Sequence, residues 1–316
     1  NLTLIIENTL EGIILSYYNC IVQQKRLELL QEVVNISEDR LIYEKTKQDL
    51  GTSSKIEYLQ RENTLLNDRS NLEIQKMNLA NSVKNFNILI GMEINRSWFF
   101  NSELTHDFQM YNYNVLLEKT LSNNSNIQNQ NINIRLANQD IKLSTSIFYP
   151  MISFNSGASY NQSNYDLGNV EYDGSTTGSS LNYFANLTIS LRLFDGGKLH
   201  STLQKIKVQK EKHSLELDKI KINVSNQLAK ILDEYNSRIV IYNINKRAYE
   251  IARTNYELAI NKQNRGVISS FILRDIETSF INSGISFLQS SYNLKQSEIS
   301  LLKITGGIIS YNKQGK

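Results

Sequence analysis

The apolar residues between positions 198 and 265 recur at alternating spacings of four and three, in a stretch that contains neither glycine nor proline. This spacing predicts one long helix with a coiled-coil seam. At a rise of about 1.5 Å per residue, some 65 residues extend roughly 100 Å, several times the width of a globular domain. Arg238 and Asn245 fall on the seam and weaken it locally. The apolar seam positions are Val224, Leu228, Ile231, Tyr235, Tyr242, Tyr249, Ala252, Tyr256 and Ala259.

Tyrosine occupies every seventh position of this seam from Tyr235 to Tyr256. Such a row is either an interhelical packing layer or an aromatic ladder for ligands. We adopt the packing layer as the interpretation and keep the ligand ladder as the alternative.

Glycines divide the helical pattern into two hairpins. After Gly266 the pattern resumes from 270 to 303 and stops at Gly306, a fitting helix C-terminus. The first part of the chain repeats this design, with a helix ending near Asp49, a break at 50–53 and a second helix reaching Gly91. The sequence therefore predicts two antiparallel helical hairpins.

The two hairpin sequences match without a gap at an offset of 215 residues, beginning at Gly51 and Gly266. That period is far too long for a solenoid, so each copy is expected to be a whole structural arm. Residues 1–101 correspond to 216–316, whereas 102–215 have no earlier partner. We therefore expect the chain to begin within a fold whose first unit extends about 100 residues further upstream. The matched pairs include Ser54 with Ser269, Glu62 with Glu277, Asn67 with Asn282, Asn78 with Asn293, Leu79 with Leu294 and Gly91 with Gly306.

The segment between the hairpins starts irregularly. Residues 92–114 carry aromatic side chains without a clear period, which predicts a packed junction. A short helix near 115–122, a break at 122–126 and another helix to about 147 follow. The aromatic residues of the junction are Trp98, Phe99, Phe100 and Phe108.

Two runs in 148–196 alternate between apolar and polar residues and predict strands of about ten residues, each with one apolar face. This is the length and pattern of a membrane-spanning strand. The loop between them is expected at 162–180. The first apolar face contains Ile152, Phe154, Ala158 and Tyr160, opposite Ser153, Asn155, Gly157, Ser159 and Asn161. The second contains Tyr183, Ala185, Leu187, Ile189, Leu191 and Leu193, opposite Asn182, Phe184, Asn186, Thr188, Ser190 and Arg192.

Two strands cannot span a membrane alone, because hydrocarbon leaves the backbone groups at their open edges without partners. The duplication predicts a further pair upstream, and four strands per chain are still too few for a sealed barrel. We therefore expect several chains to pool their strands in an oligomeric channel. Leu187, Ile189 and Leu191 are expected to face lipid, together with Ile152, Phe154, Ala158 and Tyr160.

Composition excludes several other classes of protein. The 316 residues carry 34 Lys and Arg against 31 Asp and Glu, with no dense basic block, so no nucleic-acid partner is expected. No apolar run is long enough for a transmembrane helix, so membrane contact is expected through strands. The single Cys20 excludes an internal disulfide and is interpreted as a buried thiol, with a lipid anchor as the alternative. His106, His200 and His213 lack ligand spacing, so no enzyme activity, metal or cofactor is expected.

Four short motifs stand where these elements meet. Phe148-Tyr149-Pro150 precedes the first strand and Leu193-Phe194-Asp195-Gly196-Gly197 follows the second. The hairpin tips carry Gly51…Glu62 and Gly266…Glu277, each with a further glycine 29 residues after the glutamate. By these motifs nearly the whole chain resembles the outer membrane efflux protein family of TolC-like channel-tunnels. Arg192 and Ser125 depart from the family, which commonly has Pro and Asn-Pro there.

The resemblance implies a mainly α protein with β-strands, an α+β membrane protein. Long antiparallel helical hairpins would form an α-barrel across the periplasm, and a homotrimer would share a 12-stranded β-barrel in the outer membrane of a Gram-negative bacterium. The implied parts are a first-repeat hairpin and junction at 1–101, connecting helices at 102–147, a transmembrane β-hairpin at 148–196 and a second-repeat hairpin at 197–316.

The resemblance also implies an entrance at the hairpin tips. Glu57 and Asp275 match gate acids, with a solvated helix face as the alternative. Ile272 and Ile268 replace a further acid and a gate-linking arginine of the family, which puts a charge-locked gate in doubt. The implied docking surface for a periplasmic adaptor (membrane fusion) protein comprises Gly51, Thr52, Ser53, Ser54, Gly266, Val267, Ile268, Ser269 and Ser270.

These expectations make the chain a passive exit duct of a tripartite efflux or type I secretion system, driven by an inner-membrane pump. The alternative is a structural coiled-coil scaffold without transport activity. A scaffold accounts for the helices, but it has no need of two strands that are apolar on one face.

Overall fold

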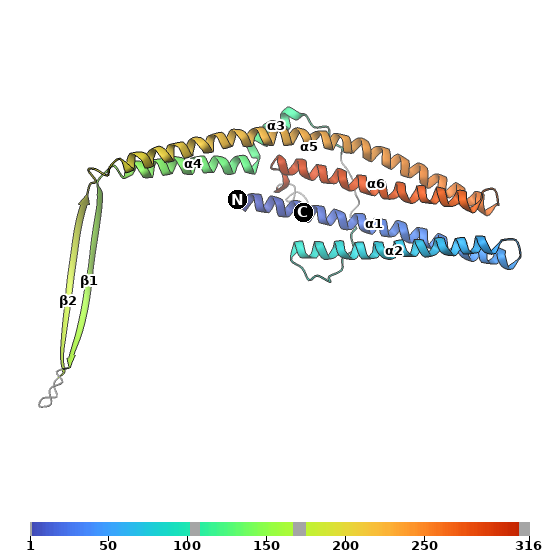
Figure 1. The fold of residues 1–316 in the computed structure, drawn as a ribbon, viewed down its shortest axis with the longest axis horizontal. Coiled ribbons are helices and arrows are strands. Elements are labelled where there is room, and N and C mark those ends of the chain that lie inside the picture. Colours follow the sequence, from blue (N-terminus) through green and yellow to red (C-terminus); the bar gives the residue numbers. More distant parts are fainter. Residues whose placement is uncertain (1, 102–107, 167–174, 310–316) are drawn as a thin grey trace. The chain divides into compact units, whose positions relative to one another are not determined.

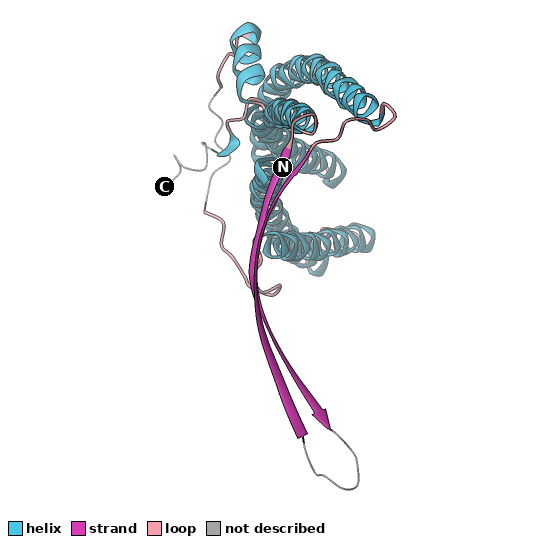
Figure 2. Ribbon diagram, turned by 90° about the vertical axis from the view of Figure 1, so that its left-hand side faces the viewer, coloured by secondary structure: helices cyan, strands magenta, loops and turns pink. Residues whose placement is uncertain are grey.

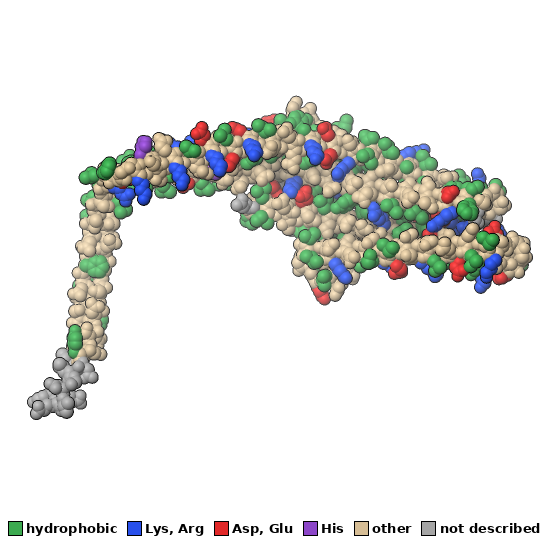
Figure 3. All heavy atoms as spheres, viewed as in Figure 1, with side chains coloured by type: hydrophobic (Ala, Val, Ile, Leu, Met, Phe, Trp, Pro, Cys, Tyr) green, Lys and Arg blue, Asp and Glu red, His purple; other side chains and the backbone are tan. Residues whose placement is uncertain are grey.

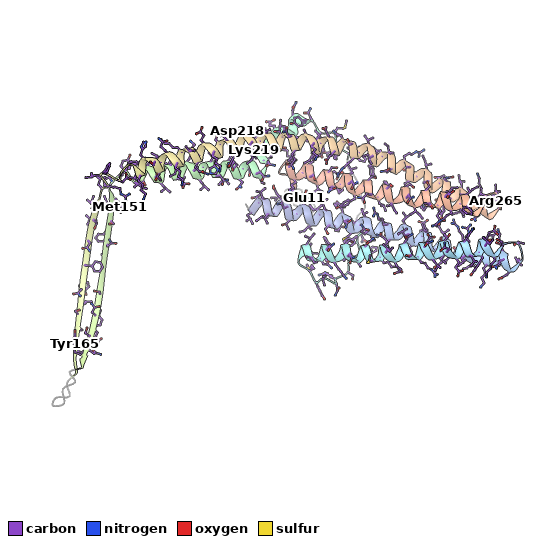
Figure 4. All side chains as sticks on the ribbon, viewed as in Figure 1. Glu11, Met151, Tyr165, Asp218, Lys219 and Arg265 are labelled. Atoms are coloured by element: carbon purple, nitrogen blue, oxygen red, sulfur yellow. The ribbon has the colours of Figure 1, made fainter. Side chains whose placement is uncertain are left out.

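The computed structural model describes residues 2–101, 108–166 and 175–309. These ranges hold six helices and one antiparallel pair of strands, so the fold is mainly α with a small sheet, as predicted (Figure 1). The chain divides into two compact units, Asn1–Asn129 with Lys219–Lys316, and Gln130–Asp218. We call the first the hairpin unit and the second the strand unit. Figure 4 labels Asp218 and Lys219, where the boundary crosses one continuous helix.

The hairpin unit contains the two predicted helical hairpins. Helix α1 (Leu2–Asp49) turns into α2 (Lys55–Ile90), and the end of α5 (Lys198–Asn264) turns into α6 (Ser270–Ile304). Figure 1 shows the helices of each hairpin running side by side to a tight turn, and Arg265 marks the second turn in Figure 4. A short helix α3 (Tyr113–Asn123) precedes α4 (Ser125–Ser146).

The tyrosine row of α5 is a packing layer, as predicted. The ring of Tyr256 stacks on Phe280 of α6 with a centroid distance of 4.9 Å, and Tyr249 stacks on Phe280 and Phe287 at 5.7 and 5.6 Å. Tyr242 follows at 5.6 Å from Phe287. Rings from the two helices, each spaced by seven residues, thus interleave along the hairpin.

One seam position differs from the prediction. Leu232 is buried, whereas Ile231 is only partly covered. Both lie between Leu228 and Tyr235 on a helix of about 3.6 residues per turn, one on each side of the seam. Periodicity alone cannot decide which side faces the partner helix.

The junction after α2 is organised around Asn87 rather than by aromatic residues alone. The buried Asn87 amide donates hydrogen bonds to the carbonyls of Ile94 and Arg96 at 3.1 and 2.7 Å, and its oxygen accepts one from Trp98 Nε1 at 2.6 Å. Phe99, expected within this junction, is exposed.

Phe100 follows and packs with Phe86, Cys20 and Ile21 in one apolar cluster. Cys20 is the buried thiol that was predicted, and burial raises its pKa. Phe108 contacts the ring of Tyr242 at 5.6 Å. His106 lies outside the described residues.

The backbone of the two hairpins repeats at the same offset as the sequence. Gly51 and Gly266 have φ of 73° and 74°, and Gly91 and Gly306 have 69° and 70°. Each of these glycines donates a hydrogen bond to the carbonyl three residues earlier, at 2.8 to 3.2 Å. Left-handed glycine therefore ends all four helical segments in the same way. Ser54 and Ser269, also 215 residues apart, cap the helices that follow.

In the strand unit, β1 (Met151–Asp166) pairs with β2 (Ser175–Ser190) along its whole length (Figure 2). Met151 and Tyr165 mark the two ends of β1 in Figure 4. The expected loop at 162–180 is too long, because 162–166 pair with 175–179. The expected continuation to Leu193 is also wrong, since β2 ends at Ser190, opposite the residue that follows Pro150. Residues 167–174 lie outside the described ranges.

The glycine motif after β2 starts helix α5. Asp195 accepts hydrogen bonds from the backbone N–H groups of Gly197 at 3.1 Å and Leu199 at 2.8 Å. Gly196 and Gly197 have φ of 67° and 81°. The Asp-Gly-Gly sequence therefore supplies both the cap and the left-handed backbone of this turn. Within the same unit, Gln130 of α4 donates hydrogen bonds to the His213 carbonyl at 2.8 Å and to Glu216 at 3.2 Å.

Gly306 and Gly91 provide a matched test of the repeated helix end. Alanine at either position takes a left-handed backbone, which costs roughly 1–2 kcal/mol. Only at Gly306 would the new Cβ lie 2.6 Å from the Asn123 carbonyl oxygen, whereas nothing lies within 4 Å of the corresponding atom at Gly91. Gly306→Ala should therefore lower the thermal unfolding midpoint more than Gly91→Ala, as measured by circular dichroism. Equal losses would contradict the packing at Gly306.

Candidate functional site

The strand pair has one apolar face. In an antiparallel ladder, residues directly opposite each other lie on the same face of the sheet. The register places Ile152 opposite Ile189 and Phe154 opposite Leu187. Ala158 and Tyr160 continue this face opposite Tyr183 and Leu181. The large apolar side chains on this face are exposed in the described chain. Of the residues expected to face lipid, only Leu191 lies beyond the ladder.

The other face of the pair is polar from Ser153 to Asn161 apart from one ring, with Met151 and Tyr165 at its two ends. Ser153 lies opposite Thr188, and Asn155 lies opposite Asn186. Phe184 lies opposite Gly157, where a Cβ would come within 2.8 Å of its ring. The ring thus covers the space left by the missing side chain. Between Ile152 and Asn161 the ladder separates one apolar surface from one polar surface, with Phe184 as the exception.

Glu57 belongs to the cap of α2 at the first hairpin tip. Its backbone N–H donates to Ser54 Oγ at 3.2 Å, and its Oε2 accepts from the Ser54 N–H at 3.0 Å. These two bonds form a capping box. The Ser53 hydroxyl lies 2.9 Å from the same carboxylate and also contacts Glu44. Hydrogen bonds from the Ser54 backbone and from both serine hydroxyls lower the pKa of Glu57, so it stays ionised at neutral pH.

The second tip has the same backbone and different side chains. Ser269 accepts a hydrogen bond from the Ile272 N–H at 3.4 Å, and Ile272 stands where the first tip has Glu57. Ile268 packs partly against the core formed by α1, α5 and α6, whereas Val267 is exposed. Asp275 is exposed one turn into α6. Among the described residues, no hydrogen bond or ion pair joins Asp275 to the first tip. The assignment of Glu57 and Asp275 to a gate stays a prediction.

The remaining tip residues expected to dock a partner are exposed or form the turns. Thr52 donates its hydroxyl to the Lys47 carbonyl at 3.0 Å. Gly51 and Gly266 are exposed, and nothing lies within 4 Å of the position of a Cβ at either. Ser270 begins helix α6. Docking at this surface likewise stays a prediction.

Sequence reasoning missed a group of buried charges between the two hairpins. Glu277 of α6 is 0% exposed and accepts a hydrogen bond from Arg40 of α1 at 3.0 Å. Asp68 of α2 accepts from Ser37 at 2.6 Å and pairs with Arg274 at 3.3 Å. These contacts join residues of α1, α2 and α6, and we call them the interhairpin ion network.

Burial dominates the electrostatics of this network. Desolvation raises the pKa of Glu277, while the neighbouring Arg40 acts in the opposite direction. Arg40 also donates to the Tyr256 hydroxyl at 3.1 Å and lies over its ring, at 5.5 Å from the centroid. Burial raises the pKa of Tyr256, so this phenol stays protonated. The network therefore also reaches the aromatic packing layer of α5.

Two kinds of site are not found in the part of the chain that the structure describes. His, Cys, Asp and Glu nowhere gather in a group of three that could hold a metal ion. None of the helices in the same ranges has a stretch long and apolar enough to cross a membrane. On the face shown in Figure 3, basic and acidic side chains are interspersed along the helices.

Comparison with known proteins explains the combination of a two-faced strand pair and capped helical hairpins. Residues 116–307 match the family described as outer membrane efflux protein. The chain belongs to this family. No curated protein matches the chain. Members of the family are channels and not enzymes, so no catalytic site is assigned to this outer membrane efflux protein.

Solved structures of similar fold include three channels. The CmeC outer membrane channel of Campylobacter jejuni matches with a TM-score of 0.70 and 16% identity, covering 98% of this chain and 66% of CmeC. The MtrE outer membrane channel of Neisseria gonorrhoeae matches with 0.71 and 14%, covering 95% and 66%. The outer membrane protein VceC of Vibrio cholerae gives 0.67 and 13%, covering 94% and 69%. The present chain thus spans about two thirds of their length and shares their fold.

The contribution of the interhairpin ion network to stability can be compared with that of an exposed ion pair within the first hairpin. Glu277→Ala leaves Arg40, whose side chain is 12% exposed, without its carboxylate, and the loss of such a partner costs about 3–5 kcal/mol. Glu38→Ala removes the exposed partner of Arg69, and an exposed ion pair of this kind contributes about 0–1 kcal/mol to stability. We expect a much larger loss of thermal stability for Glu277→Ala, measured by circular dichroism. Similar losses for both variants would contradict a stabilising role for the network.

Proposed function

We propose that this outer membrane efflux protein is a passive channel of the outer membrane. The observation that carries the proposal is the strand pair of 16 paired residues, which separates an apolar surface from a polar one between Ile152 and Asn161. Strands of this kind suit a wall with lipid on one side and water on the other. The family and the fold of the solved channels support the same function.

Closing such a wall requires more strands than one pair. The outer edges of β1 and β2 have no neighbouring strand in the described residues, and unpaired edges are costly in hydrocarbon. We infer that the channel is a homotrimer, in which each chain contributes four strands to a barrel of about twelve. The upstream pair required by this count is part of the proposal.

The helical hairpins support assembly with further copies of the chain. Ile244, Ile251 and Leu258 recur at every seventh position of α5 and are exposed, on a face other than the buried tyrosine row. An apolar stripe at this spacing suits packing against another helix. We propose that neighbouring protomers cover such stripes and close a helical barrel that extends into the periplasm.

The hairpin tips are proposed to form the entrance and the contact with other components. Each chain has two tips of equivalent backbone, so a trimer presents six. A periplasmic adaptor of the membrane fusion class would bind these tips, and an inner-membrane pump would supply the energy. Efflux and type I secretion both fit this arrangement, and the substrate is set by the pump and adaptor.

The two faces of β2 give a direct test of its position in the membrane. Leu187→Lys places a charge on the apolar face, where lysine near the bilayer midplane costs about 2–4 kcal/mol. Asn186→Lys places the same charge at the neighbouring position of the strand, which lies on the polar face, and this change should be tolerated. The fraction of protein that folds into lipid vesicles, measured by the heat resistance of the folded form in gel electrophoresis, should fall only for Leu187→Lys. Equal folding of both variants would contradict a lipid-facing surface.

Channel function and the role of the tip acids can be measured together. The full-length protein, with its trimeric mass confirmed by native mass spectrometry, should conduct ions in planar bilayers. If Glu57 and Asp275 hold the entrance closed, the Glu57→Ala, Asp275→Ala double variant should conduct more in its resting state.

Ser54→Ala is the control, because it weakens the same helix cap by about 1 kcal/mol and leaves both carboxylates in place. An equal rise in this variant would assign the effect to the cap. Conductance of the double variant identical to the parent would leave the two acids as a helix cap and a solvated residue. A stable monomer, or a trimer that never conducts, would overturn the channel function itself.

A further inference from the structure

Arg61 of α2 is a buried cation that forms no ion pair at contact distance in the described residues. Its side chain is 6% exposed, and neither its Nε nor its Nη2 has a hydrogen-bond acceptor there. A guanidinium has five N–H donors and remains charged in proteins. Burying its Nε and Nη2 without acceptors costs free energy, because these groups lose hydration and form no hydrogen bond in return. An anion bound beside Arg61 would therefore stabilise the folded chain.

Glu44 and Glu277 attract Arg61 without a hydrogen bond to it, and the carboxylates around Arg61 are bonded to other groups, Glu44 to the Ser53 hydroxyl. Glu277 Oε2 is used by Arg40 and lies 3.6 Å from Arg274, and Asp68 is used by Ser37 and Arg274. Glu277 Oε1 is also buried without a partner, but it forms no hydrogen bond with Arg61. The interhairpin ion network thus neutralises Arg40 and part of Arg274, and the charge of Arg61 is compensated only in part, by Glu44 and Glu277.

A pocket of about 200 Å³ lies beside Arg61 between helices α2 and α6. None of the residues that line it is acidic, whereas two are arginines and three others carry amide or hydroxyl donors. Arg274 meets Asp68 and Glu277 through Nη1 alone, and its side chain is 33% exposed. Its remaining nitrogens can therefore donate to a group in the pocket. The lining residues are Gln60, Arg61, Asn63, Thr64, Phe271 and Arg274.

We propose that this pocket binds an oxyanion, held between the guanidinium groups of Arg61 and Arg274. Guanidinium forks match carboxylate and phosphate oxygens, and such charge-assisted hydrogen bonds are among the strongest in proteins. The oxyanion would accept from α2 and from α6 at once, so it would add a second link between the hairpins. The source is either a free anion or an exposed carboxylate of a second copy of the chain. The site goes beyond the proposed channel function: binding of a free anion does not depend on that function, whereas the second-copy source rests on the proposed trimer.

The first arm of the test uses free anions with the full-length protein in detergent. Thermal unfolding is followed at constant ionic strength in chloride, in inorganic phosphate and in succinate. Phosphate and succinate should raise the unfolding midpoint of the parent progressively with concentration, since a ligand that binds only the folded state stabilises it. The rise should vanish in Arg61→Gln. It should persist in Arg69→Gln, a control on the same helix whose arginine side chain is 54% exposed.

The second arm asks whether another copy supplies the anion. In that case free anions have little effect, and Arg61→Gln shifts the protein from trimer towards monomer in native mass spectrometry, whereas Arg69→Gln does not. Arg61→Lys keeps the charge and loses the fork, so an intermediate shift is expected. Circular dichroism confirms that each variant retains its helices.

Two results would overturn the site. One is an anion response in Arg61→Gln equal to that of the parent. The other is the absence of any anion response combined with an unchanged trimer fraction, which would mean that Arg61 is satisfied within its own chain. Neither result depends on conductance, so the site and the channel function can fail separately.

Discussion

Helix α1 packs with adjacent residues against α2 on one side and against α5 and α6 on the other, and the hairpin unit depends on this double contact. Val33 joins the apolar cluster with α5 and α6, and Val34 joins the cluster with α2. A helix with one apolar stripe could hold only one partner. Because α1 has two stripes, it ties the hairpins together, and the interhairpin ion network lies along the same contact. The tips and the pocket beside Arg61 keep their positions because α1 fixes α2 relative to α6.

Much of the fold could be predicted, because local rules repeat along the chain. The seam of α5 follows from spacing, and the glycines that end the helices follow from the left-handed backbone that those positions require. The strand faces follow from alternation. The strand ends could not be predicted from alternation, because the ladder is formed by backbone groups. It continues through Gln162 and Ser163 after the apolar alternation stops.

The candidate site was harder to predict, because its contacts link residues far apart in sequence. Arg40 and Glu277 are separated by 237 positions, and no periodic pattern marks such a pair. The duplication was even misleading here, since Glu62 matches Glu277 in sequence but is only partly covered. For Glu57 the sequence pattern is visible but has two interpretations, because a carboxylate at the start of a helix can serve as a cap or as a gate residue.

The ring of Phe184 over Gly157 has a consequence for how the strands align. Strands rich in serine, asparagine and glycine can slide past each other at little cost, because most of their pairings are alike. Only one alignment places the ring over the residue that lacks a side chain. Sliding by two residues would bring it onto Asn155 or Ser159 instead. Phe184 on the polar face thus favours one register, and this register places the apolar side chains of the two strands opposite one another.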